Sequence, residues 1–276
     1  MNPMHDSIKL KSQQFRFFVE RIGQRSVRSI EELGYVMVLL WETLHWIVLG
    51  KSKKQSVRIS AIVNEATRIG VNAVPIVSLL VFTVGIMLAI QGIETLKTYG
   101  AESTVILGIA LSITREFSPL IVSILVAGRS GSAITARIGS MVESQEIDAL
   151  RVIGISPVRF LAAPILLAML LMLPTLTIVG DIMGLLGGAS YVSYELQISL
   201  SAYLERSLDA LSIDDIRQGL IKSFVFATII ALIGIGNGFQ VSGGAEGVGR
   251  STTRSVVMSI SLIIIADMIF TFLMNR

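Results

Sequence analysis

The sequence predicts an all-α integral membrane protein with about five transmembrane helices. Apolar residues make up 52% of the 276 residues and charged residues only 16%, unlike the composition of a soluble domain. Several apolar runs are long enough to cross a bilayer. Between two of them lies a polar, glycine-punctuated insert, Val126–Gly154. Its Arg, Glu and Asp residues would be costly in hydrocarbon, so we expect the insert to lie in water between two spans.

The apolar runs set the expected order of spans. The first run, residues 71–93, holds 23 residues without a charge, which is enough to span the hydrocarbon core. Lys222 lies near the outer end of a later run, and we expect it to snorkel to the outer interface. The glycines at Gly184–Gly188 could pair the bundle with a second copy. The expected spans are residues 71–93, 103–127, 160–180, 219–238 and 255–274, within a domain of residues 51–276.

Residues 1–50 form a separate N-terminal segment. Basic and apolar residues alternate through residues 1–30, which favours an amphipathic segment on the membrane surface over a solvated tail. The apolar run 35–49 is short for a span and is interrupted by Glu42 and His45. Basic clusters flank it on both sides, and crossing would export one of them against the positive-inside rule. We therefore expect an interfacial helix, with the N-terminus cytoplasmic and the C-terminus on the external side.

Water-soluble elements are expected on both sides of the membrane. Four arginines of the insert and its flank place it on the cytoplasmic side; they are Arg129, Arg137, Arg151 and Arg159. Gly128 and Gly131 are typical of a sharp helix exit, and residues 136–152 predict a short helix with one apolar side, suited to a partner's groove. Residues 194–218 have few Lys or Arg and apolar residues near helical spacing, which predicts an amphipathic external (periplasmic) helix. A glycine-rich cytoplasmic loop is expected at residues 240–254.

The insert resembles the signature of the MlaE/YrbE-type permeases. These are membrane subunits of ABC transporters that move phospholipid in double-membraned bacteria and, in related form, in chloroplasts. This chain has Arg137 where the family usually has Glu, and its acid and amide before I-D-A-L stand in reversed order, at residues 143–146. The matching residues are Ala127, Gly128, Arg129, Gly131, Ser132, Ala133, Ala136, Ile138, Gly139, Met141, Ile147, Asp148, Ala149 and Leu150.

The resemblance implies a function and a set of partners. It implies phospholipid transport between the inner and outer membranes, with the chain in the bacterial inner membrane. ATP would be bound and hydrolysed by a separate ABC ATPase, so this chain would need no cofactor of its own. The other implied partners are an MCE-domain periplasmic protein, a STAS-domain accessory protein and a second copy in a homodimer. The residues expected to couple to the ATPase are Arg129, Gly139, Met141, Glu146, Ile147, Asp148 and Leu150.

Four polar residues within the apolar runs are candidates for the substrate pathway: Arg115, Glu116, Gln91 and Asp267. Ionisable residues in a span almost always face the bundle interior or a cavity. Arg115 and Glu116 point about 100° apart on a helix, so they cannot form one simple pair, and R-E-x-x-P resembles the family span that lines the lipid cavity. The alternative is that these charges only brace the helices, the role we favour for Asp267. Gln91 could instead cap its own helix.

Several motifs of enzymes and binding proteins are excluded. Gly50-Lys51-Ser52 resembles the end of a P-loop, but His45 stands where that motif requires a glycine. The chain has two histidines and no cysteine, so neither a metal site nor a thiol nucleophile is indicated. The N-terminal basic residues are typical of contact with anionic lipid headgroups rather than nucleic acid. We therefore expect no catalytic residue in this chain.

The alternative function is an ion- or proton-coupled secondary carrier. It would use Arg115, Glu116 and Asp267 as a relay and would transport without any ATPase. An odd number of spans and the absence of an internal repeat weigh against it. A non-transporting scaffold, in which these charges are dispensable, is a third possibility. Neither alternative accounts for the cytoplasmic signature as well as the permease does.

Overall fold

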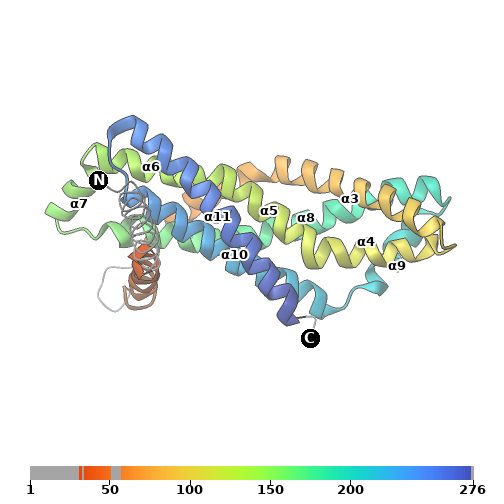
Figure 1. Cartoon of the computed structure of the whole chain (residues 1–276). Helices are drawn as coiled ribbons and strands as arrows, with labels where there is room; N and C mark the ends of the chain where they lie inside the picture. Colours follow the sequence, from red (N-terminus) through yellow and green to blue (C-terminus); the bar gives the residue numbers. More distant parts are fainter. Residues whose placement is uncertain (1–30, 33, 51–56, 275–276) are drawn as a thin grey trace, which may run out of the picture.

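The computed structural model describes residues 31–32, 34–50 and 57–274, and these are helical with short connections and no strand. Residues 1–30, on which the predicted basic surface segment falls, lie outside the described part. Figure 1 shows an elongated bundle of long helices with small helices at its two ends. The predicted all-α membrane fold is confirmed.

Five continuous helical segments are long and apolar enough to cross a membrane, as predicted: Ile59–Lys97, Glu102–Glu143, Val158–Glu195, Ile213–Phe239 and Gly244–Met274. They contain the helices α2 (Ile59–Ile69), α3 (Val74–Lys97), α4 (Val105–Ser112), α5 (Ser118–Val126), α6 (Ser132–Glu143), α8 (Ala163–Glu195), α10 (Ile213–Phe239) and α11 (Gly244–Met274). The short helical turns η1 (Val71–Ala73), η3 (Ile113–Phe117) and η4 (Ala127–Gly131) join helices within the first two segments. The turns η2 (Glu102–Thr104) and η5 (Val158–Ala162) begin the second and the third segment.

Helices α3 and α8 pack with their backbones almost touching. A Cβ atom on Gly85 would lie 2.0 Å from the Gly184 carbonyl oxygen, and one on Gly187 would lie 2.1 Å from the Phe82 carbonyl oxygen. Only glycine permits such an approach between membrane helices. The glycines of residues 184–188 are therefore used inside the chain, and the idea that this face pairs with a second copy is wrong.

Helix α10 runs through the middle of the bundle and contacts α5, α6, α8 and α11. It turns into α11 over a short connection, because α10 ends at Phe239 and α11 begins at Gly244. The predicted cytoplasmic loop over residues 240–254 is thus mostly helix. The buried face of α10 packs tightly on α6, where a Cβ atom on Gly238 would lie 2.8 Å from Ile138 Cβ.

The end of the bundle opposite α6 carries the predicted external helix. This helix is α9 (Leu200–Ala210). Ser199 caps its N-terminus, because the Ser199 side chain accepts a hydrogen bond from the Ala202 N–H. Figure 1 shows α9 beside the far end of α4. Tyr203 anchors it in a small apolar cluster of α3, α4 and α8 and is fully buried. That burial raises the pKa of Tyr203 to about 12, so the phenol stays neutral across the physiological range.

The apolar run near the N-terminus forms a helix, Gly34–Leu49, which is shorter than a span. Figure 1 shows it lying crosswise to the long helices, at the end that also holds α6. One side packs on the core through Leu39, and the opposite side exposes Trp41 and Val48. This arrangement is typical of a helix at a membrane interface, where indole rings are enriched.

Candidate functional site

Two regions contain the residues singled out from the sequence. The first is the tip formed by α6 and α7 (Glu146–Val152) at one end of the bundle (Figure 1). The predicted single helix over residues 136–152 is wrong in one respect, because it breaks between α6 and α7. Gln145 adopts a left-handed conformation there, with φ of 60°, and this turns α7 away from the direction of α6. The exit predicted at Gly128 and Gly131 is also wrong, since the helix continues through η4 as a π-helical turn.

Helix α7 presents its acidic side chains to the surroundings and keeps one apolar anchor. Ile147 is buried, whereas the Asp148 side chain is 68% exposed. Among the described residues Asp148 pairs only with Arg151 of the same helix, at 3.0 Å, and Glu146 accepts a hydrogen bond from Ser144 at 2.9 Å. Val152 and Ile153 at the end of the helix are exposed and apolar. The tip therefore combines charge and apolar surface that the described part of the chain does not cover.

The base of the tip is fixed by tight packing and by one ion pair. Gly139 is buried, and a Cβ atom there would lie 2.6 Å from Val241 Cγ2, so α6 lies directly on the α10–α11 connection. Arg137 donates two hydrogen bonds to the carboxylate of Glu65 in α2, at 2.7 and 2.9 Å. Among the other predicted coupling residues, Arg129 is exposed, and Met141 and Leu150 are half-buried.

The second region is an ionic cluster inside the bundle, centred on Lys222 of α10. Its Nζ atom donates to Glu116 Oε2 at 2.5 Å and to Thr271 Oγ1 at 3.0 Å. It also lies 2.9 Å from Asp267 Oδ1, an ion-pair distance although the angle does not suit a hydrogen bond. Lys222 is fully buried, so its predicted snorkelling to the outer interface is wrong. One cation thus joins the second, fourth and fifth spans through two carboxylates.

Arg115 makes a separate pair with Asp215 at the start of α10. Its Nε atom donates to Asp215 Oδ1 at 2.6 Å, and its terminal nitrogen Nη2 contacts the same oxygen. Asp215 also closes a capping box, since its other oxygen accepts from the Ser212 N–H and hydroxyl at 2.8 Å. Arg115 and Glu116 therefore reach different positions on α10, as their angular separation predicts. Their common origin is η3, a π-helical turn between α4 and α5.

Gln91 lies apart from these pairs. It lines a groove of about 290 Å³ between α3 and α4, together with mainly apolar side chains such as Leu88, Val105 and Ile109. Ser112 also lines the groove and stands one helical turn before Arg115. The structure thus brings Glu116 and Asp267 together, places Arg115 beside them, and leaves Gln91 in a neighbouring groove. Whether the four contact substrate stays a prediction.

Sequence reasoning misses the partners that complete these clusters. It leaves Asp215 within the external segment 194–218 and places Lys222 at the outer interface, and it links neither to the charges of the second span. The signal that could have found Lys222 is its place in an apolar run, because an intramembrane cation requires a partner. Glu65, which pairs with Arg137, carries no comparable signal, since its α2 is amphipathic and lies at the end of its span.

The Arg115–Asp215 pair leads to a prediction about stability. Replacing Arg115 with Gln should lower the free energy of unfolding by about 1–3 kcal/mol, because a charge-assisted bond to a buried carboxylate is lost. The loss is limited by the two bonds that Asp215 keeps from Ser212. Thermal unfolding in detergent measures the change. Arg217→Gln, which removes an exposed pair with Asp214, is the matched control and should change little; equal effects of the two variants would contradict the assignment.

The fold and these two regions define a class of protein. Five apolar helices, a buried ionic cluster and a polar helical tip outside the spans are features of a multi-pass membrane subunit whose tip is available to another protein. The model of the permease MlaE family matches residues 62–273, and the chain belongs to this family. It is accordingly a permease of an ABC transporter, the component that does not itself carry the catalytic chemistry.

Named relatives agree with the family. The chain is 31% identical to a probable ABC transporter permease protein of Rickettsia typhi, over 92% of this chain and 96% of that protein. It is 29% identical to the intermembrane phospholipid transport system permease protein MlaE of Haemophilus influenzae, over 93% and 97% of the two chains. It is also 39% identical to the chloroplastic protein TRIGALACTOSYLDIACYLGLYCEROL 1 of Arabidopsis thaliana, over 68% of this chain and 54% of that protein.

Proposed function

We propose that this permease moves phospholipids between the inner and outer membranes of a double-membraned bacterium, driven by a separate ATPase. The observation that carries the proposal is the α6–α7 tip, with exposed acids on a short helix anchored by one buried isoleucine. In this proposal the energy comes from a partner ATPase. The name of the Haemophilus relative supports phospholipid as the substrate.

The tip is suited to transmit a conformational change. Helix α6 continues the second span through η4. A displacement of α7 by the partner would therefore be transmitted to the helical segment that contains Arg115 and Glu116. Gly139 and the Arg137–Glu65 pair tie α6 to the α10–α11 connection and to α2. We infer that ATP binding in the partner moves this segment as a rigid element, which couples the ATPase to the spans.

The lipid path is assigned to the external half of the bundle. The groove containing Gln91 has mainly apolar walls, which suit acyl chains, and Ser112 brings it within one turn of Arg115. In this proposal the Arg115 and Lys222 clusters form the wall of the path and hold α10 and α11 against η3. Gln91 offers a hydrogen bond to a lipid ester or headgroup.

The assembly proposed around the chain follows the family resemblance. It contains two copies of this permease, two ATPase subunits, a STAS-domain accessory protein and an MCE-domain protein on the periplasmic side. The tip of α6 and α7 would face the cytoplasm, and α9 the periplasm, which puts the N-terminus inside and the C-terminus outside. ATP would be the partner's ligand, and this chain would hold no cofactor.

Charge reversal on α7 tests the docking of the ATPase. Glu146 and Asp148 are both exposed, so the double variant E146K/D148K should fold normally and lose most of the co-purifying ATPase, by about tenfold or more. The measurement is affinity purification of the tagged chain from solubilised membranes, followed by mass spectrometry of bound proteins and lipids. The control is the double variant E205K/D209K, which reverses two acids on α9 at the opposite end of the bundle. It should retain the ATPase as wild type does. ATPase recovery equal to wild type would refute docking on α7.

A further inference from the structure

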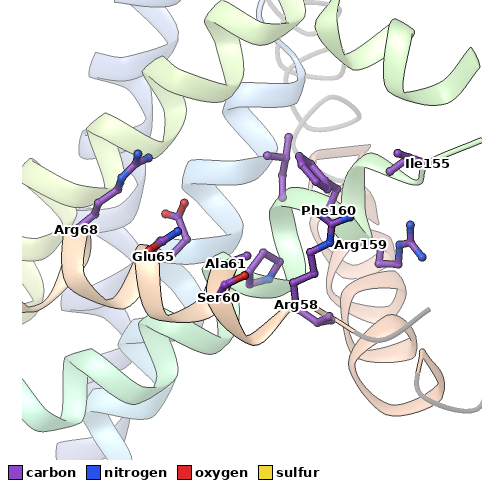
Figure 2. A pocket seen from close by; sticks show the side chains of 12 residues that line it. Arg58, Ser60, Ala61, Glu65, Arg68, Ile155, Arg159 and Phe160 are labelled. Carbon is purple, nitrogen blue, oxygen red and sulfur yellow. The ribbon is translucent and has the colours of Figure 1, made fainter. Parts of the chain in front are cut away.

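A basic cleft lies on the α6 side of the bundle, apart from the tip and the ionic clusters. Its volume is about 600 Å³, and it runs between α2 on one side and η5 with the start of α8 on the other. Figure 2 shows that Glu65 and Arg68 of α2 and Arg58, which immediately precedes it, project to the same side of that helix. The facing wall contains Ile155, Phe160 and Pro164. The transport proposal uses one lining residue, Glu65, in its pair with Arg137, but assigns no role to the cleft.

Acidic residues of the described part of the chain do not neutralise the positive charge in the cleft. Among the described residues Glu65 is the one acid in its lining, and Arg137 donates to both of its oxygens. Within the described residues neither Arg58 nor Arg68 forms an ion pair, and both are exposed. The first turn of α2 contains no acid. Two guanidinium groups therefore remain available for an anion.

The polar face of α2 is continuous along the cleft. Ser60, Asn64 and Arg68 follow one another at four-residue spacing and all line it, because residues four apart share a helix face. Arg58 and Arg68 stand about 15 Å apart along the helix. On the adjacent face Ile59 and Val63 are exposed and apolar, with 76% and 56% of their surface accessible. The cleft thus offers hydrogen-bond donors next to an apolar strip.

The position of α2 indicates where the ligand comes from. Helix α3 alone has 24 residues, about 36 Å at the rise of an α-helix, which is enough to cross the hydrocarbon core. With α3 across the core, α2, which precedes it at the α6 end, would lie beyond the core at the depth of the lipid headgroups. A phosphate group there would meet arginines that suit its geometry, while Ile59 and Val63 would lie along acyl chains.

We propose that this cleft binds a phosphate group, supplied by an anionic lipid headgroup of that leaflet or by free phosphate. The lipid is the source that the depth of α2 and its apolar strip favour. Arg58 lies near Ser60 at one end of the cleft and Arg68 near Asn64 at the other, so each arginine with its neighbouring polar side chain offers a place for the phosphate. The site holds the lipid at the α6 end of the bundle, away from the proposed transport path. Its occupancy does not depend on an ATPase, so it can be tested separately from the proposed function.

The test uses the purified chain and the double variant R58Q/R68Q. In the first arm the protein is reconstituted in nanodiscs of phosphatidylcholine with phosphatidylglycerol, and retained phosphatidylglycerol is counted by native mass spectrometry after release. Each arginine near an anionic lipid is worth about fivefold in binding, so the double variant should retain at least about tenfold less. The variant R206Q, which removes an exposed arginine on α9, is the matched control and should retain as much as wild type.

The second arm separates the two sources. Inorganic phosphate is compared with chloride at equal ionic strength for its effect on the melting temperature of lipid-free protein. Suppose phosphate stabilises the wild type but not R58Q/R68Q, while both proteins retain the same amount of lipid. This result supports the phosphate site and identifies free phosphate as its ligand. No difference between variant and wild type in either arm overturns the proposal. If R58Q/R68Q does not fold, a competition experiment on the wild-type protein replaces it. Inorganic phosphate is then added during the lipid-retention measurement, and unchanged retention of phosphatidylglycerol overturns the proposal as well.

Discussion

Replacing Lys222 with methionine should destabilise the protein by about 3–5 kcal/mol, the largest effect expected for any single charge in the chain. Lys222 is fully buried and is the only cation in the described structure that contacts Glu116 or Asp267. Its removal leaves two carboxylates facing each other across the second and fifth spans. Thermal unfolding of the detergent-solubilised protein measures the loss, which should appear as a marked fall in melting temperature.

Two further variants sharpen this prediction. Asp267→Asn in the K222M background should restore part of the lost stability, because it removes one of the two uncompensated charges. Lys97→Met removes a lysine that is 59% exposed and lies 4.0 Å from Glu195, and it should change stability by less than about 1 kcal/mol. A melting temperature of K222M equal to that of K97M would show that the cluster does not hold the spans together.

Adding a single methyl group at Gly85 or Gly187 should separate α3 from α8. The new Cβ atoms would lie 2.0 and 2.1 Å from backbone oxygens of the facing helix, and backbone cannot move aside as a side chain can. Overpacking usually costs about 1–3 kcal/mol, and we expect G85A and G187A to reach or exceed the upper end. The measurement is the melting temperature together with the fraction of protein that elutes as a single species.

Gly108 provides the matched control, because it lies within α4 and a Cβ atom added there would have no neighbouring atom within 4 Å. G108A should keep or raise stability by up to about 1 kcal/mol, since alanine is the better helix former. If G85A and G187A behaved like G108A, the close α3–α8 packing would be wrong.

The spans could be predicted from the sequence because each depends on a local property, a run of apolar residues longer than the hydrocarbon core. The crosswise helix near Trp41 and helix α9 follow in the same way, from length, charge and helical spacing. These features need no knowledge of what the segment contacts.

The errors concern contacts between segments far apart in the chain. Sequence reasoning places Lys222 at the interface because its partner Glu116 lies 106 residues away. The glycines near Gly187 have the same appearance whether they face a second copy or α3, and only the structure shows which. The break at Gln145 occurs without Gly or Pro, and the π-helical turn η3 has no sequence signature, so helical periodicity could locate neither.

ATP-dependent lipid transfer is the most direct test of the central claim. The co-purified complex would be reconstituted in liposomes containing a fluorescent phospholipid, and transfer would be followed with ATP, with a non-hydrolysable analogue and with no nucleotide. The permease account expects transfer only with hydrolysable ATP, and its loss when the E146K/D148K permease is purified and reconstituted in the same way. Transfer by this chain alone, without ATPase or nucleotide but dependent on an ion gradient, would contradict it and establish a secondary carrier.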